Sequence, residues 1–227
     1  VLWFLSGLTC THENAMTKAG AQQWASENNL ALVFPDTSPR GDLVPNHDDF
    51  DLGQGAGFYL DAKNSPWNKN FNMESYIKDE LSALIFQNFN LDQSKQGITG
   101  HSMGGLGALN FAFKNQNQFL SVSAFSPIAN PTESEWGKKQ FQIYLDDDPK
   151  TWVNHDPSIL LKKHGFKTKL LIDQGEDDNF LGLLMPKSLS NQFDLDESLG
   201  QFRYHQGYDH SYFFVATFIK DHIEHHA

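Results

Sequence analysis

The chain has 227 residues, 39% of them hydrophobic and 20% charged, which is enough to form one domain with a sizeable core. Its formal net charge of −11 at pH 7 argues against nucleic acid and anionic membranes as partners, because these attract clustered lysine and arginine. A single cysteine, Cys10, excludes an intramolecular disulfide and favours a reducing compartment, so we expect a cytoplasmic protein.

Six short apolar runs bounded by turn residues are predicted strands, at residues 1–5, 30–34, 96–99, 119–125, 169–172 and 201–204. Segments with helical spacing lie at residues 15–28, 76–89, 104–114, 186–192 and 212–225. No run approaches the roughly 20 apolar residues of a membrane span. Strands that alternate with helices predict an α/β fold with a mainly parallel central sheet flanked by helices, in a single domain over residues 1–227.

The longest region without a predicted helix or strand is residues 35–67. A loop of this length in a compact domain usually has a function, and we expect it to form a wall of the substrate pocket; a disordered surface excursion is the alternative. Acidic residues gather at 48–51, 146–148 and 176–178. For the first two runs the prediction is a solvated loop, whereas the third is a candidate for the active site.

Residues 100–104 read Gly-His-Ser-Met-Gly and match the G-x-S-x-G nucleophile elbow, in which Ser102 lies on a sharp turn between a strand and a helix. Glycines allow the close backbone approach that such a turn needs. The predicted strand at 96–99 and the predicted helix at 104–114 supply the right context in the right order. We therefore predict that Ser102 is a nucleophile; a chance glycine-rich turn is the alternative.

A serine nucleophile needs a histidine to take its proton and a carboxylate to orient that histidine. In α/β hydrolases the acid and then the histidine follow the serine along the chain. His210 fits because it lies in a glycine-containing turn between the last predicted strand and the last helix. The predicted acid is Asp178, beyond the glycine turn after the fifth strand, with Asp177 as the alternative; Asp173 is still at the strand terminus.

Hydrolysis also needs two donors for the oxyanion of the tetrahedral intermediate, and backbone amides suffice. The N–H of Met103, directly after the nucleophile, is one predicted donor. The other is expected in the loop after the first strand, where we choose the N–H of Leu8. The triad and these amides require no metal or organic cofactor.

Three histidines near the end of the chain, His222, His225 and His226, have a spacing that superficially suits a metal. We instead expect a solvated helix end, where histidines are favourably placed near the negative end of the helix dipole. No metal site is predicted.

Six blocks of the sequence together resemble the S-formylglutathione hydrolase family, also called esterase D, at residues 5–11, 35–41, 55–59, 100–105, 173–178 and 207–211. The resemblance implies an α/β-hydrolase fold and a serine thioesterase that releases formate and glutathione from S-formylglutathione in formaldehyde detoxification. It places the triad at Ser102, Asp178 and His210, with Leu8 and Met103 as the oxyanion hole, and it suggests a homodimer.

The same resemblance matches Cys10 to a family cysteine near the active site and implies sensitivity to thiol reagents without a catalytic role. It matches Trp67 to a family tryptophan that borders the acyl pocket, although core packing accounts for this residue equally well. A shift of Trp67 or Phe58 would admit larger acyl groups, so both are pocket candidates. Family members begin with several tens of residues of largely antiparallel strands, so we expect the amino-terminal strands to be missing from this chain.

Three alternative functions are compatible with these residues. A generalist carboxylesterase for short-chain esters would share the triad, an acyltransferase would need a water-poor acceptor site that has no signal in the sequence, and a binding protein would keep the fold without activity.

The glutathione moiety carries two carboxylates, so a site that binds it should contain some positive charge. Five cations lie in or near loops that could face the pocket, although each could equally be an ordinary surface residue: Arg40, Lys63, Lys69, Lys138 and Lys139.

Overall fold

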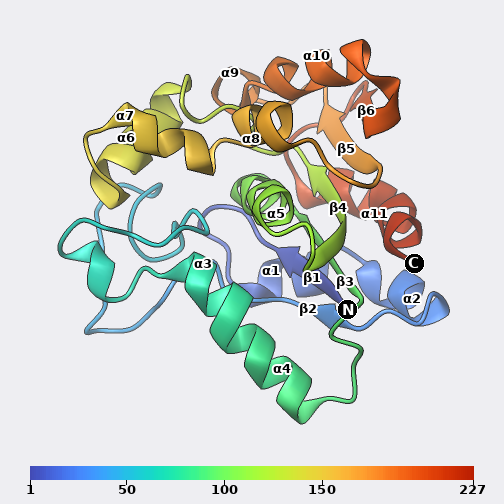
Figure 1. Ribbon diagram of the computed structural model, residues 1–227, viewed down its shortest axis with the longest axis horizontal. Helices are drawn as coiled ribbons and strands as arrows, with labels where there is room; N and C mark the ends of the chain where they lie inside the picture. The colour runs from blue at the N-terminus through green and yellow to red at the C-terminus, as the bar shows by residue number, and fades with distance from the viewer.

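All six predicted strands form, and they join into one sheet in the computed structural model, which describes residues 1–227. The sheet order is β2-β1-β3-β4-β5-β6 and every neighbouring pair is parallel (Figure 1). The strands span β1 (Leu2–Leu5), β2 (Leu32–Val33), β3 (Gln96–Gly100), β4 (Phe119–Phe125), β5 (Leu170–Gly175) and β6 (Gly200–His205). The predicted α/β class is confirmed.

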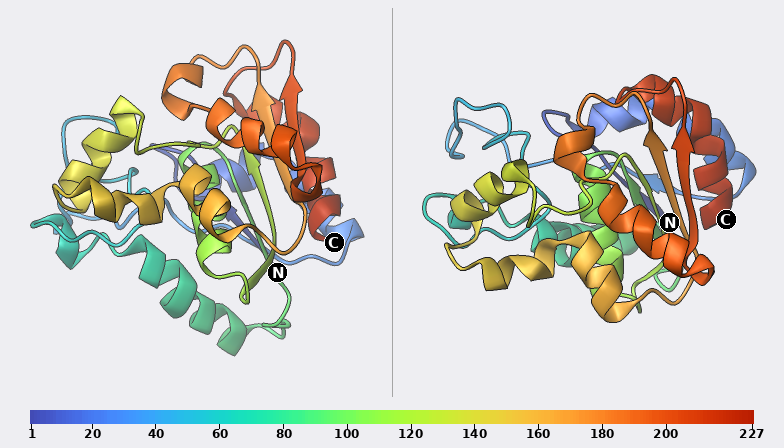
Figure 2. Two further views of the ribbon diagram at one scale, coloured as in Figure 1. Left: turned by 45° about the horizontal axis from the view of Figure 1, so that its top comes forward. Right: turned by 90° about the horizontal axis from the view of Figure 1, so that it is seen from above.

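The helices cover both faces of this sheet. They are α1 (His12–Lys18), α2 (Ala21–Glu27), α3 (Met73–Ser75), α4 (Ser82–Asn88), α5 (Met103–Lys114), α6 (Glu135–Tyr144), α7 (Pro149–Trp152), α8 (Pro157–His164), α9 (Leu181–Leu184), α10 (Lys187–Leu195) and α11 (Tyr212–His226). Figure 2 shows α2 and α11 on the side of the sheet opposite α5. None of these helices is both long enough and apolar enough to cross a bilayer.

Alternation along the central strand β1 explains the two layers of the core. Trp3 and Leu5 join the larger apolar cluster, which includes the buried side chains of α5, while Leu2 and Phe4 join a smaller cluster with α1, α2 and α11. Successive side chains of a strand point to opposite faces, and both faces of β1 are fully buried. A continuous apolar run is therefore what a central parallel strand requires.

Helix boundaries differ from the prediction in two places. The helix expected at residues 15–28 is two helices, because Gly20 adopts φ 67° between α1 and α2 and ends the regular backbone. The helix expected at residues 76–89 begins with a π-helical segment, Tyr76–Leu81, which continues into α4. Helices α6, α7 and α8, between β4 and β5, were not predicted.

The prediction of a solvated helix end for the terminal histidines is wrong. His222 is fully buried, and its Nε2 lies 3.3 Å from Oδ2 of Asp173 on β5. His226 contacts β4 through its ring nitrogens, at 2.7 Å from the hydroxyl of Ser121 and 2.9 Å from that of Ser123. The physical reason is that α11 lies along the sheet, so its last turn faces strands and not solvent.

The long loop between β2 and the 3₁₀ turn Trp67–Lys69 contains no regular element, as expected, but internal hydrogen bonds order it. The N–H of Gly57 donates to the carbonyl of Thr37 at 3.1 Å, and the N–H of Gly55 donates to the hydroxyl of Ser38 at 2.7 Å. The acidic run within this loop is not solvated throughout, which corrects the prediction. Asp51 is only 4% exposed, because its carboxylate is hydrogen-bonded to α6.

Candidate active site

The nucleophile elbow has the backbone strain that its sequence predicts. Ser102 stands between β3 and α5 with φ 59° and ψ −120°, and its N–H donates to the carbonyl of Phe125 at 2.9 Å. A Cβ added to Gly104 would lie 2.0 Å from the carbonyl oxygen of Leu5, and one added to Gly100 would lie 2.2 Å from that of Gly104. Only glycine fits at both positions, which explains the spacing of the motif.

A short hydrogen bond joins the predicted acid to the predicted base. Nδ1 of His210 lies 2.6 Å from Oδ2 of Asp178, and the carboxylate also accepts from the N–H of Phe180 at 2.8 Å and from the amide of Gln174 at 3.1 Å. Burial raises the pKa of Asp178, but these donors and the nearby imidazole outweigh it and hold that pKa below its ordinary value. The alternative acid, Asp177, is exposed and lies outside this network.

The His210 ring is held between two other rings. The centroid of His101 lies 4.5 Å away, and the ring of Phe180 meets His210 edge-on at 5.0 Å. Burial lowers the pKa of His101 well below its usual value, so this neighbour is neutral. Ser102 and His210 line the same pocket, and the serine hydroxyl makes no hydrogen bond to another protein group. A long contact between nucleophile and base is common before substrate binds.

The loop after β1, which contains Gly7 and Leu8, packs against Ser102. A Cβ added to Gly7 would lie 3.2 Å from Cβ of Ser102. The N–H of Leu8 donates to no protein acceptor, and Met103 is the first residue of α5, where the N–H has no partner within the helix. Both predicted donors are therefore free to bind an oxyanion beside Ser102.

Neighbouring segments hold this loop in place. The N–H of Thr9, a residue with φ 64°, donates to the carbonyl of Gly55 at 2.9 Å. The hydroxyl of Tyr59 donates to the carbonyl of Ser6 at 2.8 Å, and the Arg40 guanidinium donates to the carbonyl of Cys10 at 2.8 Å. Residues of the long loop thus fix the backbone of the loop after β1, so the N–H of Leu8 is preorganised to stabilise an oxyanion.

The pocket around Ser102 has a volume of about 230 Å³ and a largely apolar wall. Burial raises the pKa of the Cys10 thiol, which lies on this wall and is only half-buried. The lining residues are Gly7, Leu8, Thr9, Cys10, Phe50, His101, Ser102, Trp136, Phe180, His210 and Tyr212.

Two predicted pocket residues lie elsewhere. Trp67 is 7% exposed and packs edge-on against Phe71 and Tyr144, at centroid distances of 5.1 and 5.3 Å. Phe58 lies 6.4 Å from Tyr144 in the same aromatic group, and neither residue is on the pocket wall. Both are core residues, because the turn after the long loop folds inward onto α6.

Sequence reasoning missed four aromatic residues of the wall. Phe180 and Tyr212 each lie two residues after a predicted triad member, so their positions could have been inferred. Phe50 and Trp136 come from the long loop and from α6, and no local pattern links them to the site.

Most of the predicted cations are paired with carboxylates. Arg40 binds Asp36 at 2.9 Å, Lys63 binds Asp146 at 3.2 Å, and Lys138 lies 4.0 Å from Glu133. Lys139 contacts two aspartates of the long loop.

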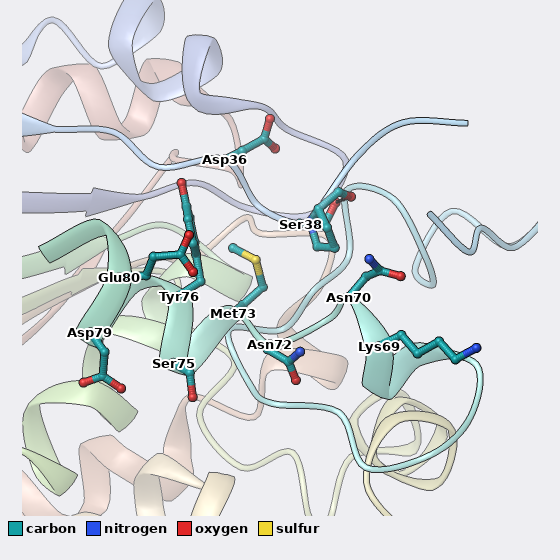
Figure 3. Close-up of a pocket in the computed structure, with 11 residues that line it drawn as sticks. Asp36, Ser38, Lys69, Asn70, Asn72, Met73, Ser75, Tyr76, Asp79 and Glu80 are labelled. Carbon is teal, nitrogen blue, oxygen red and sulfur yellow. Dashed lines mark hydrogen bonds between the residues drawn. The ribbon is translucent and has the colours of Figure 1, made fainter. Parts of the chain in front are cut away.

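Lys69 lies on a separate polar cavity of about 540 Å³, at the end opposite Asp79 and Glu80 (Figure 3). That cavity is the larger one, but it contains no residue of the predicted triad or oxyanion hole. No group of three or more histidine, cysteine, aspartate or glutamate side chains is placed to hold a metal ion.

Comparison with known proteins agrees with the geometry. The family model described as "Putative esterase" matches residues 1–225. S-formylglutathione hydrolase of Paracoccus denitrificans is 57% identical over the whole chain and 81% of the relative's length, and that of Mus musculus is 49% identical over the whole chain and 82% of the relative. The structure of an S-formylglutathione hydrolase from Agrobacterium tumefaciens aligns with a TM-score of 0.94 at 44% identity, covering 99% of this chain and 82% of that one.

Likeness to more distant solved structures is evidence for the fold alone; a ferulic acid esterase aligns with a TM-score of 0.68 at 16% identity, over 98% of this chain and 82% of that one. The full-length matches at 57% and 49% identity are of a different kind, since they extend through both faces of the sheet and every loop around Ser102. The chain therefore belongs to the S-formylglutathione hydrolase family of esterases.

Proposed function

We propose that this protein is a serine thioesterase that hydrolyses S-formylglutathione to formate and glutathione, with Ser102 as nucleophile, His210 as base and Asp178 as the orienting acid. The observation that carries the proposal is the 2.6 Å bond between His210 and Asp178 beside an elbow serine in one small pocket. The identity of 57% over the full chain to a named S-formylglutathione hydrolase supports the choice of substrate.

Acylation begins when Oγ of Ser102 attacks the thioester carbonyl carbon and Nε2 of His210 takes the hydroxyl proton. Asp178 stabilises the imidazolium through Nδ1. The developing oxyanion accepts hydrogen bonds from the N–H groups of Leu8 and Met103, a type of donor whose loss typically costs about 3 kcal/mol of barrier stabilisation. The carbon–sulfur bond then breaks, and His210 returns the proton to the departing glutathione sulfur.

Deacylation repeats the sequence with water. His210 takes a proton from a water molecule that attacks the formyl-serine carbonyl, and the same two amides stabilise the second oxyanion. Collapse of this intermediate releases formate, and His210 returns its proton to Oγ of Ser102. Apart from the substrate and this water, each step uses only protein groups, so the mechanism calls for no metal or organic cofactor.

The surroundings of the pocket suit a small acyl group. Aromatic rings line this cavity of about 230 Å³ beside Ser102, which accommodates a formyl group. Arg40 is the one predicted cation bonded to a pocket-lining residue, through the carbonyl of Cys10, but its guanidinium is already paired with Asp36. The homodimer that the family resemblance suggests and the cytoplasmic location that the single cysteine favours stay predictions.

The test is turnover of S-formylglutathione by the chain and by Ser102→Ala, with 4-nitrophenyl acetate assayed alongside. Thioester hydrolysis that far exceeds ester hydrolysis and disappears in the variant supports the proposal. Ester hydrolysis alone would favour the generalist carboxylesterase. A folded chain with neither activity would favour a non-catalytic binding protein.

A further inference from the structure

Asp51 is a buried carboxylate that the reaction itself does not use. It belongs to the long loop, is 4% exposed, and accepts three side-chain hydrogen bonds from α6. Oδ2 accepts hydrogen bonds from Nε1 of Trp136 at 2.7 Å and from the side-chain amide of Gln140 at 2.8 Å, and Oδ1 accepts one from Nζ of Lys139 at 2.7 Å. The spacing of these donors places them on one face of the helix, turned toward the loop.

The same contacts hold part of the pocket wall. The ring of Trp136 stacks on Phe180 with centroids 5.9 Å apart and planes at 22°, and Phe180 meets His210 edge-on. Phe50, next to Asp51 in the chain, packs against Trp136 at 6.4 Å, and all three aromatic residues line the pocket. The aromatic wall, defined here as Phe50, Trp136 and Phe180, therefore joins the loop, α6 and the turn after β5.

Packing holds the members of this wall unequally. Phe50 is 64% exposed, so little buried area fixes it, whereas Trp136 is only 9% exposed and its indole N–H has Asp51 as its hydrogen-bond acceptor. The hydrogen bond to Asp51 also raises the pKa of Lys139, which ties the loop to α6 by a charge-assisted bond. Removing the carboxylate would leave the indole N–H without its acceptor and free the ring to turn away from Phe180.

We propose that Asp51 is a positioning residue for acyl-group selectivity: by holding Trp136 against Phe180 it keeps the pocket small and excludes longer acyl chains. The proposal rests on the proposed hydrolase function only in requiring an acyl group at Ser102. It does not depend on which thiol or alcohol leaves.

The loop should remain folded without this carboxylate, because other bonds attach it. The N–H of Gly53 donates to the hydroxyl of Tyr144 on α6 at 2.6 Å, and the N–H of Gly55 donates to Ser38 at 2.7 Å. A matched control is also present. Asp49 lies 2.9 Å from Nζ of the same Lys139, yet it is exposed and is not bonded to Trp136.

The experiment compares Asp51→Ala, Asp49→Ala and Trp136→Phe with the parent chain, using 4-nitrophenyl acetate and 4-nitrophenyl butyrate. Alanine removes both acceptor oxygens, whereas asparagine would keep one for the indole N–H. The readout is the butyrate-to-acetate ratio of kcat/KM, together with the circular dichroism spectrum and Tm. One methylene in an apolar pocket changes kcat/KM by about 10- to 200-fold, so we expect Asp51→Ala to raise the ratio by about tenfold or more. Asp49→Ala should leave the ratio within about twofold, since its bond is on the surface.

Trp136→Phe removes the same N–H and should raise the ratio in the same direction, and adding Asp51→Ala to it should change the ratio little further. Trp136→Phe also gives the readout if Asp51→Ala does not fold. An unchanged ratio in the folded variants, or an equal change in Asp49→Ala, would overturn the proposal. Because the ratio uses ester substrates, it can be measured even if the chain fails to turn over S-formylglutathione, a result that would contradict only the proposed substrate.

Discussion

Replacing Asp178 with asparagine should reverse the tautomer of His210. Three groups donate to this carboxylate: the N–H of Phe180 to Oδ1, and His210 and the Gln174 amide to Oδ2. Asparagine offers one acceptor oxygen. The backbone N–H of Phe180 cannot change its role, so it should keep that oxygen, which turns the new NH₂ group toward Nδ1 of His210. Nδ1 must then accept, the ring proton moves to Nε2, and the imidazole can no longer take the Ser102 proton.

The size of the effect follows from two losses. The bond between His210 and the carboxylate is charge-assisted in the transition state, and losing such a bond costs about 1.5–3 kcal/mol, or about 10- to 150-fold in rate. The wrong tautomer adds to this, because the base must first be re-protonated on the other nitrogen. In Ser-His-Asp enzymes the two losses together reach about 10⁴-fold in kcat, so we expect Asp178→Asn to lower kcat by about 10³- to 10⁴-fold.

The measurement is kcat for S-formylglutathione and for a nitrophenyl acetate ester, with Asp177→Asn as the matched control. Asp177 is the neighbouring exposed carboxylate, so its replacement should change kcat by no more than about twofold. Circular dichroism should show that both variants are folded. A folded Asp178→Asn enzyme within about tenfold of the parent, or a large loss in Asp177→Asn instead, would refute the assignment of the acid.

Three further predictions concern stability. Gly104→Ala places a Cβ 2.0 Å from a β1 carbonyl oxygen and should lower the free energy of unfolding in urea by about 3 kcal/mol, whereas Gly182→Ala, with open space around its Cβ, should change it little. Arg203→Gln leaves the fully buried carboxylate of Asp173 without its bidentate partner. This variant should lower the free energy of unfolding in urea by about 3–5 kcal/mol. Burial strongly lowers the pKa of His101, so below about pH 6.5 the unfolded chain binds a proton that the folded chain does not. This residue should therefore lower the free energy of unfolding by about 1.4 kcal/mol for each pH unit as the pH falls. Urea midpoints at pH 7.5 and 5.5 measure this loss, and His101→Phe should make it smaller; an unchanged pH dependence would contradict the explanation.

The parts of the site that the sequence predicts are those fixed by contacts close along the chain. The elbow is specified within five residues, because the glycines at 100 and 104 are required by backbone atoms of the turn and of the neighbouring strand. The turn that presents His210 is similarly local. The mainly parallel sheet with helices on both faces also follows from the alternation of short strands and helices, whereas the strand order comes only from the structure.

Long-range polar contacts account for the main errors. The sequence treats Asp51, His222 and His226 as solvated because they are polar and lie in a loop or at a helix end. Each instead contacts a group that is distant in the chain: α6 for Asp51, β5 for His222 and β4 for His226. Burial of a polar side chain depends on its partner, and a local pattern contains no information about that partner.

Two aspartates, Asp173 within β5 and Asp178 in the turn after it, show why burial alone does not separate a structural carboxylate from a catalytic one. The side chains of Asp173 and Asp178 are both fully buried, and both have a pKa below the ordinary value despite that burial. Arg203 occupies both oxygens of Asp173 and is always charged, so the negative charge is already balanced. Asp178 faces His210, which lines the pocket with Ser102, so its charge becomes most useful when that ring takes the serine proton. The imidazoles of His205 and His222 also lie 3.3 Å from Asp173, but neither lines that pocket. The location of the partner beside Ser102, more than the carboxylate's own environment, therefore distinguishes the two roles.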